Sequence, residues 1–312
     1  MGFNKANTLA KEGIPFLIIS NFKADSVEVI PLDELEAHHI RYCICEDYSY
    51  REHEHFLEKS PLDFSEYKKK FDAVIEKIKA GETYILNLTQ ATPIETKLSL
   101  DEMYGLANAH YKLRYKDQFV CFSPEKFIQI KENKIHTFPM KGTIDAAIKN
   151  AKEKILTNEK EMAEHVMIVD LLRNDLSIVA TNVEVEEFRY IKKINAGAKE
   201  LLQVSSHISG TLDDSWREHL GDILQAMLPA GSISGAPKKS TLDTIERVEA
   251  YERGFFSGIF GVFDGQSFDS GVMIRFIEKS PNGYLYKSGG GITLDSSVYM
   301  EYKELQDKVY LP

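Results

Sequence analysis

The chain has 312 residues, a formal net charge of −10 at pH 7 and a hydrophobic fraction of 43%. This acidic balance argues against nucleic acid as a partner, because phosphates require a basic protein surface. No apolar run approaches the length of a membrane span, and the N-terminal residues lack the apolar core of a signal peptide. The three cysteines show no zinc-ligand spacing. The sequence therefore predicts a reduced, soluble, cytoplasmic protein that binds neither nucleic acid nor a membrane.

Apolar periodicity and turn residues predict the order of elements, and no linker, repeat or low-complexity stretch divides residues 1–312. The elements of the first half are, in chain order, a hairpin of strands 16–20 and 26–30, a strand at 40–45, a helix at 63–80, a strand at 84–89, a helix at 100–113 and a hairpin of strands 119–122 and 127–130. Those of the second half are a helix at 152–172, strands at 183–186 and 191–196, a helix at 222–228, a hairpin of strands 258–265 and 270–278, and a helix from about 297.

Two acidic steps lie far apart in the chain, Glu161-Met-Ala-Glu164 and Glu301-Tyr-Lys-Glu304. Each falls in a predicted helix, where a three-residue spacing puts both carboxylates on one face. A single step of this kind is usually a solvated helix face. If the two faces meet, however, four like charges need a cation between them, and hard oxygen ligands suit Mg²⁺.

Two cations are candidates for the same site. Lys141, in Pro139-Met-Lys-Gly-Thr143, is either a nucleophile or a fixed positive charge. Arg275 is the one charge within the apolar run of strand 270–278, so it requires either an acidic structural partner or an anionic ligand.

A glycine triplet, Gly289-Gly290-Gly291, precedes the last predicted helix. Three glycines allow backbone N–H groups to converge on an anion, although a tight turn explains a triplet equally well. Lys308 follows at helical spacing from the second acidic step, so a base and two acids share one face just after the glycines.

At these residues the chain resembles the chorismate-utilising enzymes, and most closely their aminodeoxychorismate synthase (component I) branch. The matching stretches are Ser123-Pro-Glu-Lys-Phe127, Pro139–Thr143, Ala163–Asp175, Leu228-Pro-Ala-Gly-Ser-Ile-Ser-Gly-Ala-Pro-Lys238, Gly271-Val-Met-Ile-Arg275 and Gly289-Gly-Gly-Ile292. Their order follows the family from about residue 60 to the C-terminus, and residues 1–60 are a divergent N-terminal portion. The resemblance implies an α+β fold: one large domain in which two antiparallel sheets pack together with helices outside.

Two positions separate the chemistries within this family. Anthranilate synthases typically have Ala where this chain has Lys141, whereas aminodeoxychorismate synthases have Lys. Isochorismate and salicylate synthases carry a water-activating lysine at the position of Ile85, which cannot activate water. The resemblance thus favours amination of chorismate at C4, with anthranilate synthesis as the second reading and a non-catalytic chorismate-binding subunit as the third.

The resemblance also assigns chemical roles. Glu125 is the general acid for the departing C4 hydroxyl, and its pKa must be raised for that role. Lys141 adds at C2, and ammonia then attacks C4 and releases the lysine. Lys141 must be neutral to attack, a state that desolvation or nearby positive charge favours.

Further residues are assigned to metal and substrate. Glu164 and Glu304 are expected to bind Mg²⁺ directly. Glu161 and Glu301 are expected to act through a bound water or by contacting the direct ligands. The residues expected to bind substrate are Arg275 for the enolpyruvyl carboxylate, Lys308 and the backbone of Gly289, Gly290 and Gly291 for the ring carboxylate, and the hydroxyls of Thr143 and Ser232.

Some positions depart from the family pattern. Phe256 replaces a frequent Tyr beside the enolpyruvyl carboxylate, Gln203 replaces a frequent His, and Ser232 replaces the usual Thr. Nothing in the chain resembles a glutamine amidotransferase, so a separate subunit is expected to supply ammonia. Conversion of the product to 4-aminobenzoate, on the route to folate, would need another enzyme.

Overall fold

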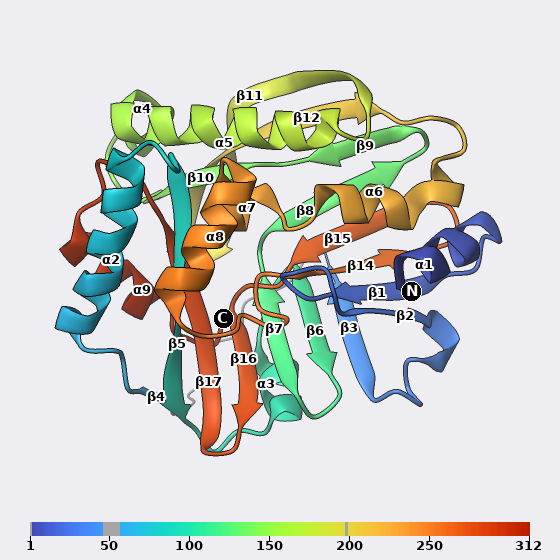
Figure 1. The fold of residues 1–312 in the computed structure, drawn as a ribbon, viewed down its shortest axis with the longest axis horizontal. Helices are drawn as coiled ribbons and strands as arrows, with labels where there is room; N and C mark the ends of the chain where they lie inside the picture. The colour runs from blue at the N-terminus through green and yellow to red at the C-terminus, as the bar shows by residue number, and fades with distance from the viewer. Residues whose placement is uncertain (1, 46–56, 197–198) are drawn as a thin grey trace.

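The computed structural model describes residues 2–45, 57–196 and 199–312, which form two antiparallel sheets with helices around them (Figure 1). The strands of the nine-stranded sheet are β1 (Phe16–Ser20), β2 (Val27–Pro31), β8 (Lys126–Lys131), β9 (Lys134–Thr137), β10 (Met140–Asp145), β11 (Thr181–Ala196), β12 (Lys199–Thr211), β14 (Ile259–Phe263) and β15 (Phe268–Val272). The strands of the eight-stranded sheet are β3 (Ile40–Ile44), β4 (Glu58–Lys59), β5 (Ile85–Glu95), β6 (Tyr111–Tyr115), β7 (Phe119–Ser123), β13 (Gly235–Ala236), β16 (Phe276–Ser280) and β17 (Gly283–Ile292). The predicted fold class is confirmed.

The helices lie outside the two sheets. They are α1 (Gly2–Lys11), α2 (Phe64–Lys79), α3 (Leu100–Leu106), α4 (Ala151–Thr157), α5 (Glu159–Ser177), α6 (Leu220–Met227), α7 (Gly231–Ser234), α8 (Lys238–Glu249) and α9 (Val298–Asp307). Helix α5 runs along β10, β11 and β12, and α2, α8 and α9 gather around β5 and β17 (Figure 1). None of the helices in the described ranges is long and apolar enough to cross a membrane.

Strands of the nine-stranded sheet bury side chains on both faces of the sheet. On β1, Phe16 and Ile18 pack in the cluster shared with the helices, whereas Leu17 and Ile19 pack against the second sheet. This alternation follows from the two-residue period of a strand. The predicted pairing of the first two strands is confirmed by the register Ile18 to Val29.

Two segments cross from one sheet to the other, and both were predicted differently. Strands β7 and β8 are not a hairpin: β7 pairs with β6 and β16, and β8 pairs with β9 and β15. The strand predicted at 270–278 is likewise divided into β15 and β16. Arg275 therefore lies in the connection between the sheets, with a φ of +52°, rather than inside a strand.

These two crossings lie side by side because their backbones are hydrogen-bonded to each other. The amide of Val272 donates to the carbonyl of Glu125 (3.0 Å), and the amide of Phe122 donates to the carbonyl of Arg275 (3.2 Å). The sequence pattern could not reveal the two crossings, since the alternation of apolar residues indicates a strand but not the sheet to which that strand belongs.

Three other elements differ from prediction. The helix predicted at 100–113 ends at Leu106, because the residues after it alternate as the strand β6. The helix at 152–172 is two helices, divided at Asn158, whose side chain accepts from the amide of Glu161 (3.0 Å) and caps α5. The strands at 183–186 and 191–196 are one strand, β11, interrupted by register shifts, with Arg189 at a φ of +54°.

The glycine triplet is neither a turn nor a loop, because it belongs to β17. Gly289, Gly290 and Gly291 pair with Thr89, Leu88 and Asn87 of β5. The tight-turn explanation is therefore wrong.

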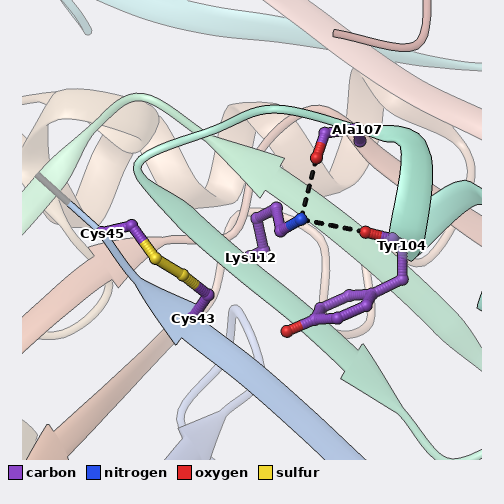
Figure 2. Close-up of a disulfide and its surroundings, with 5 residues drawn as sticks. All are labelled: Cys43, Cys45, Tyr104, Ala107 and Lys112. Atoms are coloured by element: carbon purple, nitrogen blue, oxygen red, sulfur yellow. Dashed lines mark hydrogen bonds between the residues drawn. A yellow bond between two sulfur atoms is a disulfide. The ribbon is translucent and has the colours of Figure 1, made fainter. Parts of the chain in front are cut away.

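The cysteines also differ from the expected reduced state. Cys43 and Cys45 are joined by a disulfide at the end of β3 (Figure 2). Alternate residues of a strand share a face, and the two Cα atoms are 5.8 Å apart. Lys112, across from Cys43 on β6, donates to the carbonyls of Tyr104 (3.0 Å) and Ala107 (2.8 Å). Cys121 is a free, buried thiol.

Candidate active site

A cavity of about 250 Å³ lies where the two crossings, the ends of β5 and β17, strand β10 and helices α5 and α7 meet. The residues of the predicted site that line it are Glu125, Lys141, Glu164, Ser232, Arg275, Gly289, Gly290, Gly291 and Lys308. Residues that are far apart in the sequence thus contribute to one enclosed surface.

Glu125 is fixed in the first crossing, directly after Pro124. Its amide donates to the Ser123 hydroxyl (3.0 Å), and its side-chain Oε1 accepts from the Ser232 hydroxyl (2.5 Å). Burial raises the pKa of the Glu125 carboxyl, although Ser232 and the more distant Lys308 and Lys141 oppose the rise. A carboxyl in this setting is suited to donate a proton near neutral pH.

Lys141 projects from β10 and forms an ion pair with Glu164 of α5, with 2.8 Å between Nζ and Oε2. The Glu164 side chain is only 9% exposed. Burial favours the neutral amine, but Glu164, and more weakly Glu304 and Glu161, outweigh it and raise the pKa of Lys141. The surroundings of Lys141 in this arrangement therefore favour the ammonium over the neutral amine that nucleophilic attack requires.

The second acidic step lies on α9 beside the middle glycine of β17. A Cβ on Gly290 would come within 3.4 Å of Glu301 Oε2 and 3.8 Å of Glu304 Oε1. Burial opposes the charge on Glu304, but Lys308, at 2.7 Å, helps to lower its pKa. Burial and the neighbouring Glu304 raise the pKa of Glu301.

The four carboxylates offer the oxygen chemistry that a hard cation needs. Glu161 Oε2 is buried without a hydrogen-bond partner in the part of the chain that the structure describes. A Cβ on Gly142 would lie 2.8 Å from this oxygen, so Gly142, at a φ of +83°, makes room for it. Within 2–45, 57–196 and 199–312, however, no three acidic or histidine side chains already converge as a ready metal site. Lys141 and Lys308 are paired with two of the carboxylates instead.

Arg275 has the features of an anion-binding residue. Its Nη1 is buried with no hydrogen-bond partner among the described residues, and its guanidinium stacks on the Tyr310 ring at 4.6 Å. No carboxylate of the described residues pairs with it, so the structural ion-pair explanation is not supported. Phe256 lines the same cavity and offers no hydrogen bond.

Thr143 does not line the cavity, and it is exposed. Lys141 and Thr143 would share a face of a regular strand, but the register of β10 shifts between Met140 and Thr143. Ile85 does line the cavity, where its aliphatic side chain lies near Gly291. Gln203 lies on β12, across from Thr143.

Sequence reasoning missed several residues around the cavity. Asn87 lines it and has a buried Oδ1 without a partner in the described ranges. Behind α7, Asp175 pairs with Lys238 (3.1 Å), and Arg253 donates to the carbonyls of Ile233 and Asn87. Asp175 and Lys238 are the last residues of two of the stretches that resemble the family, Ala163–Asp175 and Leu228–Lys238. This placement was the one feature of the sequence that could have pointed to them.

The chain is similar to known proteins over most of its length. A family model described as chorismate binding enzyme matches residues 31–311. The chain is 45% identical over 312 residues to an "Uncharacterized PabA-like protein" of Haemophilus influenzae, covering 99% of this chain and 95% of that protein. It is 32% identical over 259 residues to aminodeoxychorismate synthase component 1 of Bacillus subtilis, covering 77% of this chain and 54% of that longer protein.

A solved structure extends the comparison to the fold. Anthranilate synthase component I from Streptococcus pneumoniae superimposes with a TM-score of 0.69 at 25% identity, covering 81% of this chain and 58% of the other. The match of the family model over most of the chain, together with these relatives, shows that the chain belongs to the family of chorismate binding enzymes.

Proposed function

We propose that this enzyme aminates chorismate at C4 to give 4-amino-4-deoxychorismate, with ammonia from a separate glutamine amidotransferase subunit. The observation that carries the proposal is that Lys141 and Glu125, a potential nucleophile and a potential proton donor, line one cavity with Arg275. The reaction would take place in the cytoplasm and serve the synthesis of 4-aminobenzoate and folate. Relatives named aminodeoxychorismate synthase component 1 support this reading.

Chorismate carries two carboxylates on a cyclohexadiene with an allylic C4 hydroxyl. Arg275 suits the enolpyruvyl carboxylate, because its buried Nη1 has no hydrogen-bond partner in the described chain and a guanidinium is a planar group of N–H donors. Lys308 and the backbone of Gly289, Gly290 and Gly291, which line the same cavity, suit the ring carboxylate. This orientation would present the C4 hydroxyl to Glu125.

The chemistry follows from these positions. Hydroxide is a poor leaving group, so Glu125 donates a proton and the C4 oxygen departs as water. Lys141 Nζ forms a bond to C2 as the double bond shifts and the C4–O bond breaks. Ammonia then forms the C4–N bond, the C2–N bond to Lys141 breaks, and Glu125 regains a proton. Chorismate and ammonia thus give aminodeoxychorismate and water.

Magnesium is part of the proposal, and Glu164 and Glu304 would bind it directly, with Glu161 and Glu301 behind them. When bound, the ion would supply positive charge against the ring carboxylate and the acidic side chains. Lys141 must lose its proton before it attacks, and in the present arrangement the neighbouring carboxylates stabilise the protonated form of Lys141.

Anthranilate synthesis remains the second candidate, because relatives named anthranilate synthase component 1 are also about 30% identical to this chain. Lys141 and Ile85 favour C4 amination over it. A chorismate-binding subunit without activity is the third candidate.

The reaction assay tests the proposal directly. Purified protein with chorismate, Mg²⁺ and an ammonium salt should form aminodeoxychorismate, identified by chromatography with mass detection. A cognate amidotransferase with glutamine should increase the rate. Anthranilate and pyruvate as main products would favour the second candidate, and saturable binding of chorismate without turnover would favour the third.

Lys141→Ala should lower the rate of aminodeoxychorismate formation by more than about 100-fold, because it removes the nucleophile. Chorismate binding should persist, since Arg275 and Lys308 are untouched. Any residual activity is expected to move towards direct addition of ammonia at C2. A variant with near-normal C4 amination would show that Lys141 is only a fixed cation.

Glu164→Gln and Glu304→Gln should each raise the Mg²⁺ concentration needed for half-maximal activity, because a hard cation loses a charged ligand. Glu161→Gln and Glu301→Gln should have smaller effects, up to about 10–100-fold. Glu159→Gln, an exposed position on the same helix α5, is the matched control. Unchanged Mg²⁺ dependence in all four variants would show that these residues do not bind the metal.

Arg275→Lys should weaken chorismate binding by roughly 10–100-fold, because the charge remains but the planar pair of donors is lost. The melting temperature without ligand should hardly change, since Arg275 has no ion-pair partner within the described chain. Arg173→Lys, in the exposed pair with Asp170, is the matched control. An early-melting variant with normal affinity would assign Arg275 a structural role.

A further inference from the structure

An ion pair between a buried carboxylate and a partly buried lysine lies behind the wall of the cavity, and the proposed chemistry does not use it. Asp175, near the end of α5, is 2% exposed, and its Oδ1 lies 3.1 Å from Nζ of Lys238, the first residue of α8. The same ammonium donates to the carbonyl of Met227, the last residue of α6 (3.0 Å). One charge pair therefore joins α5, α6 and α8.

The segment between α6 and α8 carries a wall of the cavity. It contains α7, with Ser232, whose hydroxyl donates to Glu125 Oε1 at 2.5 Å. Since Met227 and Lys238 stand at its two ends, their contact closes the segment into a loop. The ion pair between Lys238 and Asp175 then joins that loop to α5.

The pair also reaches the residue directly before Ser232. The second oxygen of Asp175, Oδ2, lies against Gly231, where a Cβ would come within 2.7 Å of it. This oxygen makes no hydrogen bond of good geometry within the described residues, although the Gly231 amide lies close enough to oppose the rise in the pKa of Asp175. The start of α7 is thus pressed against the carboxylate with no room for a side chain.

A charge pair is an unusual way to join helices for stability alone. Burial raises the pKa of Asp175 and Lys238 opposes this rise, which reflects the cost of removing the charge from water. Well-packed apolar residues often stabilise such a joint as well as or better than an ion pair. The presence of an ion pair at this joint is better explained by the position in which it holds α7.

We propose that Asp175 and Lys238 are positioning residues that hold Ser232 against Glu125 and thereby set the acidity and orientation of that carboxyl. With Oε1 occupied by the Ser232 hydroxyl, Oε2 is the oxygen left to carry the proton to substrate. The inference rests on the proposed role of Glu125 as general acid. The charged groups that face Glu125 are Lys141 from β10 and Lys308 after α9.

The test follows the titration of Glu125 itself, and so does not depend on turnover. The carboxyl is observed by ¹³C NMR in glutamate-labelled protein and assigned by its loss in Glu125→Gln. Asp175→Asn keeps the shape of the side chain and removes its charge. Its effect should be a rise in the pKa of Glu125, because Ser232 no longer holds the carboxylate anion.

A double-mutant cycle identifies the route of the effect. Ser232→Ala should raise the same pKa, and Asp175→Asn should add nothing further in the Ser232→Ala background. Asp170→Asn, an exposed aspartate on the same helix, is the matched control and should leave the titration unchanged. In kinetic assays the high-pH limb of kcat should move upward in Asp175→Asn while KM changes little.

The proposal fails if Asp175→Asn is folded and leaves the Glu125 titration unchanged, or if the two substitutions act additively. If Asp175→Asn does not fold, Lys238→Met and Lys238→Arg take its place: the first should raise the pKa of Glu125 and the second should restore it. A normal titration in Lys238→Met would also overturn the proposal. Failure of C4 amination in the wild type would contradict the proposed function. The titration of Glu125 would still decide whether Asp175 and Lys238 position Ser232.

Discussion

The hydrogen bonds between the two crossing segments are the constraint on which this site depends. The amide of Val272 binds the carbonyl of Glu125, and the amide of Phe122 binds the carbonyl of Arg275. The two crossings run next to each other where they pass from one sheet to the other. Glu125 and Arg275, which are 150 positions apart in the chain, therefore line one cavity. Because the carbonyls of Glu125 and Arg275 accept hydrogen bonds from the neighbouring crossing, the backbone positions of both residues are tied to the junction of the sheets.

Charge balance is the second organising feature of the cavity. Glu164 lines it, whereas Glu161, Glu301 and Glu304 lie near enough to act on the charge of Lys141 without lining it. Lys141 and Lys308 form ion pairs with Glu164 and Glu304. The orphaned oxygen of Glu161 and the raised pKa of Glu301 indicate that the balance is incomplete. Such an arrangement is poised to accept further positive charge, which would also compete for the partners of Lys141.

Much of the site was predictable, because it depends on local spacing and on motifs. The three-residue steps placed their carboxylates on α5 and α9, as expected for helices. The two crossings could not be predicted, since apolar alternation at 119–130 fits a hairpin as well as two strands in different sheets. Thr143 was misplaced for a similar reason: the register shift in β10 is invisible in the sequence. Arg253 and the pair of Asp175 and Lys238 act through backbone carbonyls and buried contacts, which leave no periodic signal.

The central claim is that Lys141 bonds to chorismate, and intact-protein mass spectrometry tests it most directly. The protein is incubated with chorismate and Mg²⁺ without any ammonia source, so that the lysine adduct cannot be released by amination. The expected result is an added mass equal to chorismate less one water, which peptide mapping assigns to Lys141 and which Lys141→Ala lacks. Turnover with ammonia but no adduct without it, or an adduct that persists in Lys141→Ala, would contradict the account.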